Sequence, residues 1–383
     1  MSLNTPLYVD VHVLHTVPPS NLNRDDAGTP KQAIYGGVRR ARVSSQAWKR
    51  ATRKAFVSLL PPEQLATRTK RLHALLTDRI IRRAGLGNDE AARITNTIIE
   101  TIRIKKAKRG AETAYLLFFG LAQLDAIAEL VAETASDLAS MSDADLKDAI
   151  KDLPVSEHLR RRHPIDVALF GRMVADVSAL NVDAATQVAH ALSTHAVDVE
   201  FDYFTAVDDE NPREQTGAGM IGTVEFNSAT LYRFATVGVH QLVENLDANI
   251  DATMQALDAF LTAFVRSMPT GHQNSFAHRT VPHLVMTVVR KDQPVNLVSA
   301  FESPVRPDNG LAVESARRLA EELNRATELW ALSPLSTGAT YDRSVDLNGA
   351  LETAVGPSKP FPELVSTTVE TVRAQLIEAS SNE

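Results

Sequence analysis

The spacing of apolar positions divides the chain into strand-rich segments on either side of a long helical segment. Residues 7–14, LYVDVHVL, alternate apolar and polar side chains, and residues 197–207 do the same with acids at the polar positions. A two-residue period is typical of a strand that buries one face. Residues 220–237 and 282–290 are rich in β-branched and aromatic side chains, so we predict strands in these four segments.

The two central strands are separated by residues 208–219, DDENPREQTGAG, which are polar and contain glycine and proline. Such a stretch between two strand patterns predicts a reversal of the chain. We therefore expect a long β-hairpin with an exposed tip.

Helical patterns occupy most of the remaining chain. Residues 62–195 are rich in alanine and leucine with few strand signals, and further helices are expected at 246–267 and 309–329. A strand and a helix are followed by a helical insertion and then by alternating strands and helices, an order consistent with a ferredoxin-like core. The predicted fold class is α+β with a large helical insertion.

A short helix is expected after the first strand and a loop at 21–43. Ser44 or Ser45 can cap this helix, which runs to about Leu59 before a pair of prolines. At about 100° per residue, one side carries Trp48, Thr52, Ala55 and Leu59. The opposite side carries Lys49, Arg50, Arg53 and Lys54. The helix can therefore bury Trp48 while it presents four cations.

Positive charge is concentrated in residues 27–54, which contain eight Lys or Arg and no Asp or Glu, although the chain has a net charge of -7. A solvated surface is the ordinary explanation for a charged helix. An acid-free run of this length favours a polyanion site instead, because arginines, helix N-termini and backbone N–H groups all bind phosphate. The adjacent Gly36–Gly37 pair permits close approach of the backbone to a ligand.

Two smaller basic clusters lie in the helical segment. The first contains Lys105, Lys106, Lys108 and Arg109, and the second contains Arg160, Arg161 and Arg162. Duplex DNA or a neighbouring subunit would be held by such clusters, but solvated helix faces explain them equally well. Both explanations stay open at this point.

Two pairs of acids and four histidines are candidates for metal chemistry. Asp25–Asp26 and Asp208–Asp209 could bind a metal, but adjacent acids point in different directions in most backbones, and two-metal sites need several convergent carboxylates. Turn formation is the better interpretation of both pairs. No strong ligand spacing links the histidines, so we expect structural roles for His12, His15, His190 and His195.

Several functional classes are excluded by what the sequence lacks. Without cysteine there is no disulfide, thiolate metal site or cysteine nucleophile. The densest apolar run, 114–124, is too short to span a bilayer, and the first twenty residues lack signal-peptide features, so a cytoplasmic protein without a membrane partner is expected. Walker, Rossmann and nucleophile-elbow motifs are missing, as is the aromatic motif of a base-stacking RNA-recognition sheet. We therefore predict no cofactor and no catalytic residue, and a bound RNA would be held by its backbone.

Blocks of sequence between residues 21 and 234 resemble one known family. The blocks are NLNRDD at 21–26, KQAIYGG at 31–37, RRARVSSQAWKR at 39–50, DVALFGRM at 166–173, AHALSTH at 189–195, FDYFTAVDD at 201–209, IGTVEF at 221–226 and YRF at 232–234. In combination they are similar to the CasC (Cse4) family, the backbone subunits of the type I-E CRISPR surveillance complex, Cascade. The C-terminal third matches more loosely.

The resemblance implies a right-hand-like subunit. An RNA-recognition-type (RRM-like) palm would comprise residues 1–60 and 196–383, including a β-hairpin thumb at 197–237, and helical fingers would comprise residues 61–195. Members of the family are non-catalytic and oligomerise along CRISPR RNA (crRNA), holding its spacer for pairing with target DNA in antiviral defence. The implied partners are crRNA, target DNA in an R-loop, further copies of the chain, the large, small, 5′-handle-cap and crRNA-processing subunits, and a recruited helicase-nuclease.

The resemblance also assigns roles to individual residues. Contacts with the RNA backbone fall to Arg24, Lys31, Gln46, Lys49, Arg50 and Arg53. The loop at 21–43 and the helix that follows it would together form a cradle for RNA phosphates. This predicted cradle would also include Asn23, Arg39, Arg40, Arg42 and Ser44. The thumb and a kinked nucleotide would be contacted by Met173, Tyr203, Phe204, Thr205 and Ile221. Position 203 is Tyr where a relative has Trp, position 221 is Ile where it has Leu, and core packing would otherwise be the better interpretation of Met173.

Two other functions stay open. A metal-dependent ribonuclease of a CRISPR effector would use Asp25, Asp26, Asp208 or Asp209. A stand-alone RNA-binding regulator would use the same basic stretch without partner subunits. Cleavage of a labelled guide RNA in the presence of Mg²⁺ would separate the ribonuclease from the scaffold.

Overall fold

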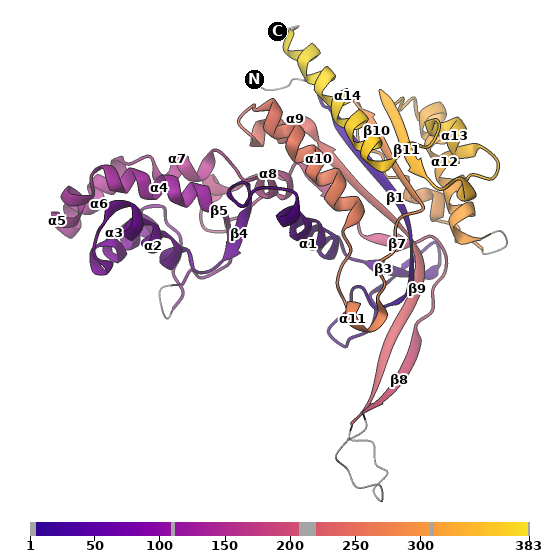
Figure 1. Ribbon diagram of the computed structural model, residues 1–383, viewed down its shortest axis with the longest axis horizontal. Helices are drawn as coiled ribbons and strands as arrows, with labels where there is room; N and C mark the ends of the chain where they lie inside the picture. The colour runs from indigo at the N-terminus through magenta and orange to yellow at the C-terminus, as the bar shows by residue number, and fades with distance from the viewer. Residues whose placement is uncertain (1–4, 109–111, 207–219, 307–309, 382–383) are drawn as a thin grey trace, which may run out of the picture. The chain divides into compact units, whose positions relative to one another are not determined.

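The chain folds as two units, each with its own hydrophobic core (Figure 1). The computed structural model describes residues 5–108, 112–206, 220–306 and 310–381. The larger unit, called the sheet unit, comprises Thr5–Ala55, Gln187–Thr236 and Phe260–Glu383. The smaller unit, called the helical unit, contains Phe56–Thr186 and Val237–Ala259.

One antiparallel sheet organises the sheet unit. Its strands follow the order β11-β10-β1-β9-β7-β3-β2, and β6 and β8 also pair with β9. The strands are β1 (Tyr8–Ser20), β2 (Gln32–Tyr35), β3 (Val38–Val43), β6 (Thr186–Val188), β7 (Ala191–Ser193), β8 (Glu200–Ala206), β9 (Met220–Gly238), β10 (Leu284–Arg290) and β11 (Ser336–Tyr341). The four predicted strands are confirmed as parts of β1, β8, β9 and β10.

Helices cover both faces of this sheet (Figure 1). They are α1 (Ser45–Ala55), the end of α10 (Ile250–Arg266), α11 (Gln273–Phe276), η4 (Leu297–Phe301), α12 (Leu311–Trp330), η6 (Arg343–Val345), α13 (Ala350–Val355) and α14 (Phe361–Ser381). Met286 and Val288 of β10 share a core cluster with Leu319 of α12, whereas the hydroxyl of Thr287 lies 2.8 Å from that of Thr368 on α14. Because successive side chains of a strand point to opposite faces, α12 and α14 lie on opposite sides of β10.

The first helix begins where the sequence predicts. Ser44 Oγ accepts a hydrogen bond from the Ala47 N–H at 3.3 Å, so Ser44 is the N-cap. Trp48 is buried, as the helical period requires. The helix ends at Ala55, however, and a 3-10 turn follows. Leu59, predicted to lie on the buried side, is therefore 42% exposed.

The prediction of a loop at 21–43 is wrong in its second half, which forms the hairpin of β2 and β3. Gly36 and Gly37 make its turn with φ angles of 60° and 78°, a pair of left-handed conformations typical of two-residue hairpin turns. A Cβ on Gly36 would lie 1.6 Å from the carbonyl oxygen of Glu302. We predicted that the Gly36–Gly37 pair lets the backbone approach a ligand closely. At Gly36, the backbone instead lies close to the backbone of Glu302.

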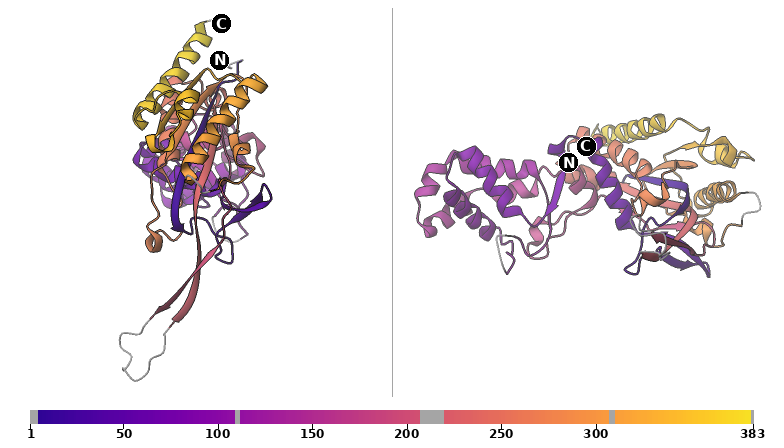
Figure 2. Two further views of the ribbon diagram at one scale, coloured as in Figure 1. Left: turned by 90° about the vertical axis from the view of Figure 1, so that its right-hand side faces the viewer. Right: turned by 60° about the horizontal axis from the view of Figure 1, so that its bottom comes forward.

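The long hairpin predicted at 197–237 is confirmed. β8 pairs with β9 from Glu200 opposite Phe226 to Thr205 opposite Ile221, and the pair projects from the sheet (Figure 1, Figure 2). Its predicted tip, 208–219, lies outside the described residues.

The helical unit confirms the predicted helical segment over residues 72–170, from α2 to α8, and adds a strand pair. The prediction is wrong at the end of the 62–195 segment, where β6 and β7 are strands of the main sheet. β4 (Ala66–Thr69) and β5 (Leu117–Gly120) form a two-stranded antiparallel sheet. The helices and turns are η1 (Phe56–Ser58), η2 (Pro62–Gln64), α2 (Leu72–Ala84), α3 (Asn88–Thr101), α4 (Leu121–Glu133), α5 (Ala135–Ser140), α6 (Asp143–Asp152), α7 (Val155–Arg160), α8 (Ile165–Phe170), η3 (Ser178–Leu180) and α9 (Val239–Asn245). Leucine and isoleucine side chains of α2, α3 and α4 fill its core.

The chain returns to the helical unit after β9. Asn245 of α9 donates from Nδ2 to the Ala168 carbonyl at 2.9 Å, and the Gly238 N–H donates to the Ala185 carbonyl at 2.7 Å. This return segment is separated in sequence from the insertion expected at 61–195. The mixture of helices and antiparallel strands confirms the α+β class. None of the described helices is long and apolar enough to cross a membrane.

Candidate nucleic-acid interface

The acid-free stretch forms a continuous piece of the sheet unit, from β2 through β3 to α1. Trp48 on α1 is 1% exposed, and the guanidinium carbon of Arg233 lies 3.8 Å from its ring centroid. On the surface of the region, Arg24, Arg39, Gln46, Arg50 and Lys54 are exposed, and Lys31, Arg42, Lys49 and Arg53 are half-buried. The division of α1 into a buried side around Trp48 and a cationic side is confirmed.

Neutral groups orient the exposed arginines of this region. Arg24 Nη1 lies 2.7 Å from Nε2 of His272, and Arg39 Nη1 donates to Oε1 of Gln32 at 3.0 Å. A neutral acceptor fixes the direction of a guanidinium without cancelling its charge. These arginines therefore remain available to an anion.

Arg42 shows the same arrangement. It donates from Nε to the Gln32 carbonyl at 2.9 Å, and its Nη1 lies 3.2 Å from Nδ1 of His190. Burial lowers the pKa of His190, and the charges of Arg42 and Lys31 lower it further. The neutral imidazole can then accept the hydrogen bond of Arg42.

Carboxylates do not neutralise this surface within the described residues. Over 5–108, 112–206, 220–306 and 310–381, no ion pair involves Arg24, Lys31, Arg39, Arg42, Lys49 or Arg50. Burial lowers the pKa of Lys49. A cation that is partly removed from water without a counter-charge is stabilised when an anion approaches it.

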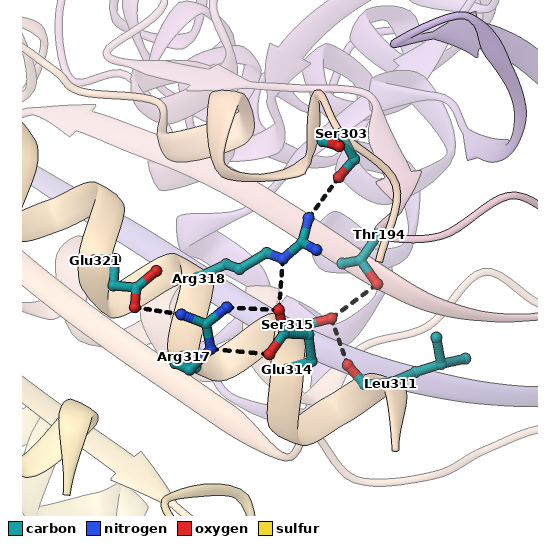
Figure 3. Close-up of polar contacts among 8 residues, drawn as sticks. All are labelled: Thr194, Ser303, Leu311, Glu314, Ser315, Arg317, Arg318 and Glu321. Atoms are coloured by element: carbon teal, nitrogen blue, oxygen red, sulfur yellow. Dashed lines mark hydrogen bonds and ion pairs between the residues drawn. The ribbon is translucent and has the colours of Figure 1, made fainter. Parts of the chain in front are cut away.

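The arginines of α12 show the opposite arrangement in the same unit (Figure 3). Glu314 accepts hydrogen bonds from Arg317 at 2.6 Å and from Arg318 at 2.8 Å, and Arg317 also bonds with Glu321. These bonds, led by that of Arg317, lower the pKa of Glu314 to about 2. Arg318 donates in addition to the Ser303 carbonyl at 2.6 Å. The charges of α12 are therefore neutralised within their own helix.

Some of the predicted contact residues build the loop that carries the cations. Asn23 Oδ1 accepts the N–H of the buried Ser44 at 2.8 Å and so ties the loop to the start of α1. Asp25 Oδ1 accepts the Ala27 N–H at 2.9 Å and the Thr29 N–H at 3.1 Å. The turn interpretation of Asp25 is thereby confirmed.

Arg40 does not fit the predicted cradle. Its side chain is fully buried and donates to the carbonyl oxygens of Tyr35, Ser193 and Phe301 at 2.8 to 3.1 Å. A guanidinium saturated by buried carbonyls cannot reach a phosphate in this fold. Because Arg39 and Arg40 are neighbours in a strand, they point to opposite faces of the sheet. We therefore remove Arg40 from the candidate interface and keep Arg39.

The β8–β9 hairpin presents aromatic side chains to its surroundings. Phe201 and Tyr203 are 67% and 63% exposed, and their spacing in one strand places them on the same face. Phe204, on the other face, is 37% exposed, and Thr205 is exposed opposite Ile221. Phe201 is missing from the predicted set, although its alternation with Tyr203 could have identified it.

Met173 belongs to the helical unit and is 82% exposed, which excludes core packing. Its neighbour Arg172 is buried and donates to the carbonyls of Leu159 and Leu180 at 2.8 and 2.7 Å. Gly171, at φ 75°, is required beside it, because a Cβ there would lie 2.8 Å from a backbone oxygen. The packed backbone at Gly171 and Arg172 therefore holds the side chain of Met173 in an exposed position.

Half of the described cations in the basic clusters of the helical unit are paired with acids. Lys105 Nζ lies 2.5 Å from Oδ1 of Asp176, and Lys106 Nζ lies 2.9 Å from Oε1 of Glu100. Arg161 forms an ion pair with an acid one helical turn away at 3.4 Å. Three further cations are exposed, Lys108, Arg160 and Arg162, and Arg109 lies outside the described residues. The pairing favours the solvated-face interpretation for Lys105, Lys106 and Arg161.

The buried histidines are structural, as expected. His12 Nδ1 lies 2.9 Å from the Tyr232 hydroxyl, and His15 Nε2 lies 2.9 Å from a threonine hydroxyl. Burial lowers the pKa of each to about 3, so both rings are neutral. In the part of the chain that the structure describes, no three His, Asp or Glu side chains converge to hold a metal ion. Asp208 and Asp209 lie outside that part.

Fold and charge together define a class: an α+β protein with an accessible cationic surface on its sheet unit. Residues 9–367 match the family model of the CT1975-like proteins, and the chain belongs to this family. It is similar to a chain of a solved "CRISPR RNA-guided surveillance complex, pre-nicking", with a TM-score of 0.80 and 30% identity over 95% of this chain and 99% of that chain. It is also similar to a chain of a second CRISPR RNA-guided surveillance complex, with a TM-score of 0.71 and 28% identity at the same coverage.

A comparison with curated protein sequences gave no match. The family match and the two structural matches make the chain homologous to subunits of CRISPR RNA-guided surveillance complexes. At this level the resemblance noted in the sequence is confirmed.

Proposed function

We propose that the chain is the backbone subunit of a Cascade-type complex and holds crRNA by its phosphates. The observation that carries this proposal is the orientation of exposed arginines by neutral groups, as at Arg24 and Arg39. The homologous subunits come from complexes described as RNA-guided, which supplies the class of ligand.

The arrangement suits a protein that grips RNA without reading its sequence. Arginines with uncancelled charge bind phosphates and displace their counterions, whatever the bases. In an RNA-guided complex, base pairing supplies the sequence specificity, so the protein needs to hold only the backbone. A chain with a net charge of -7 can bind RNA because cations without a carboxylate partner, such as Arg24 and Arg39, gather on one surface of the sheet unit.

The finer assignments are part of the same proposal. The sheet unit corresponds to an RRM-like palm, the β8–β9 hairpin to the thumb and the helical unit to the fingers of a type I-E subunit. Tyr203 on the hairpin supports a kinked nucleotide, and Met173 of the helical unit is a separate candidate for such a contact, because exposed aromatic and apolar side chains stabilise unstacked bases. Further copies of the chain, target DNA and the other Cascade subunits are its partners.

We propose no catalytic role for this subunit. Asp25, one of the four acids considered for a ribonuclease, already accepts two backbone N–H groups of its own turn. A carboxylate engaged in this way is poorly placed to join a two-metal site.

Co-purification tests the proposal. The tagged chain is expressed with a CRISPR array and the other complex subunits, and we expect it to bring down crRNA of one fixed length. A mixture of cellular RNAs, bound equally well without the other subunits, would favour a stand-alone regulator. Mg²⁺-dependent cleavage of labelled guide RNA that is lost in an Asp26→Ala variant would establish a ribonuclease.

A further inference from the structure

A short polar segment, residues 270–277, lies against the loop that precedes the basic stretch (Figure 1). Gly271 makes the contact, because a Cβ on it would lie 2.4 Å from the carbonyl oxygen of Asn21. At the other end, the ring centroid of Phe276 lies 5.7 Å from that of Phe226 on β9. The segment therefore lies between the loop and strand β9 of the β8–β9 hairpin.

His272 connects this segment to the candidate interface. Its Nε2 lies 2.7 Å from Nη1 of the exposed Arg24. Because a guanidinium can only donate, the ring nitrogen is the acceptor of this bond, and the direction of Arg24 is fixed while its charge is kept. The backbone holds the ring in place through two left-handed residues that bracket α11, His272 at φ 48° and Ala277 at φ 46°.

Three neutral donors follow directly. Gln273, Asn274 and Ser275 are exposed, and within the described part of the chain their side chains make no hydrogen bond to protein. Amide and hydroxyl side chains commonly donate to phosphate oxygens and contact the 2′-hydroxyls of RNA. Because the three residues directly follow His272, an RNA backbone bound at Arg24 would pass beside this single helical turn.

We propose that residues 271–275 are a second wall of the RNA site. His272 positions Arg24 against one phosphate, and the side chains of Gln273, Asn274 and Ser275 donate to phosphates and 2′-hydroxyls of single-stranded RNA. This inference rests on the proposed function, and it brings a segment of the C-terminal third into the site.

Salt dependence separates the neutral donors from the cations. Binding of the full chain to fluorescein-labelled single-stranded RNA is measured between about 50 and 200 mM salt. The double variant Gln273→Ala, Asn274→Ala should bind about tenfold more weakly at every salt concentration, with an unchanged slope of log K against log salt, because amides release no counterions. Arg24→Ala should weaken binding and also make the slope shallower by about 0.7.

A rescue experiment tests the positioning role of His272. His272→Ala should weaken binding about threefold to tenfold, and His272→Gln should recover most of the loss, because its amide oxygen can accept from Arg24. In an Arg24→Ala background, His272→Ala should cause no further loss, since His272 acts through Arg24. Additive losses would contradict this role.

Crosslinking of the unmodified chain covers the case in which a variant fails to fold. RNA carrying 4-thiouridine should crosslink to the peptide that contains residues 270–277. Two results would overturn the second wall and leave the proposed function standing. The first is crosslinks that are confined to the basic stretch. The second is wild-type binding by the 273–274 double variant under conditions in which Arg50→Ala binds weakly. Failure of the unmodified chain and its complex to bind RNA would instead overturn the proposed function.

Discussion

The basic stretch of the sheet unit and the basic clusters of the helical unit look alike in sequence but differ in their partners. Arg39 of the stretch is oriented by a glutamine, and Arg24 of the preceding loop is oriented by a histidine. In the helical unit, Lys105 and Lys106 lie within 3 Å of carboxylate oxygens. The difference shows that the density of cations does not define an anion site by itself. What matters is whether the fold leaves their charge uncancelled.

The same contrast exists inside the sheet unit. Arg317 and Arg318 of α12 share the carboxylate of Glu314, so that part of the surface carries little excess charge (Figure 3). Arg39, by contrast, keeps its charge on β3. Long-range attraction of a polyanion depends on net local charge, so we expect RNA to approach the β2–β3–α1 surface.

The largest effect is expected on the stability of the fold, from substitution of the buried Arg40. Arg40→Ala should lower the free energy of unfolding by about 3–5 kcal/mol, because it leaves several buried carbonyls without a donor. Urea unfolding followed by circular dichroism measures it. Arg39→Ala, one residue away and exposed, is the matched control and should change stability by less than about 0.5 kcal/mol. Equal destabilisation by the two variants would contradict the separation of Arg40 from the interface.

The next effect compares an unpaired with a paired cation. Arg50→Ala should weaken binding to single-stranded RNA about tenfold and make the salt slope shallower by about 0.7, because one phosphate contact and its released counterion are lost. Lys49→Ala should act in the same direction. Fluorescence anisotropy over a range of salt concentrations measures both quantities.

Arg317→Ala is the control for this comparison. Its cation is already paired with Glu314 and Glu321, so we expect RNA affinity and slope to stay at the wild-type values. A loss as large as that of Arg50→Ala would show that pairing does not decide which cations bind RNA.

A smaller effect concerns pH at His190. The folded state holds this pKa below the ordinary value of 6.5, so it binds fewer protons than the unfolded chain, and stability from this group falls as pH drops below 6.5. A bound phosphate favours the protonated ring, so RNA affinity should rise on acidification, by about threefold. His190→Gln keeps an acceptor for Arg42 but cannot titrate. If His190→Gln shows the same rise, His190 is not its source.

The smallest effect is expected in the helical unit. Asp176→Asn removes the charge that pairs with Lys105 and should raise non-specific RNA affinity by about twofold. Lys105→Ala, made in the wild-type background, should leave affinity unchanged. A marked loss in Lys105→Ala would show that this cluster binds RNA despite its ion pair, and would weaken the contrast between the two units.

Local patterns were sufficient for several elements. The alternation at 197–207 predicted β8, and the helical period from Ser44 predicted the buried Trp48 and the cationic side of α1. These features depend on side chains a few residues apart, which the sequence displays directly. The β2–β3 hairpin, by contrast, was missed, because its strands are short and one is rich in arginine.

Contacts between distant residues could not be predicted in this way. Arg39 and Arg40 are neighbouring arginines that the sequence alone does not distinguish. The packing of β3 against β7 and η4 buries the guanidinium of Arg40 and leaves that of Arg39 exposed. The partner of Arg24 is His272, 248 residues further along the chain. No periodicity reports such a pairing.

The sequence by itself therefore determined the α+β class, the amphipathic helix α1, the long hairpin and the place where positive charge gathers. Tertiary structure alone decided which cations keep their charge: Arg24 and Arg42 meet histidines, Lys105 meets Asp176, and Arg40 is enclosed by carbonyls. The physical reason is that local periodicity acts over one or two helical turns, whereas the electrostatic state of a side chain depends on every group that folding brings to within a few ångströms.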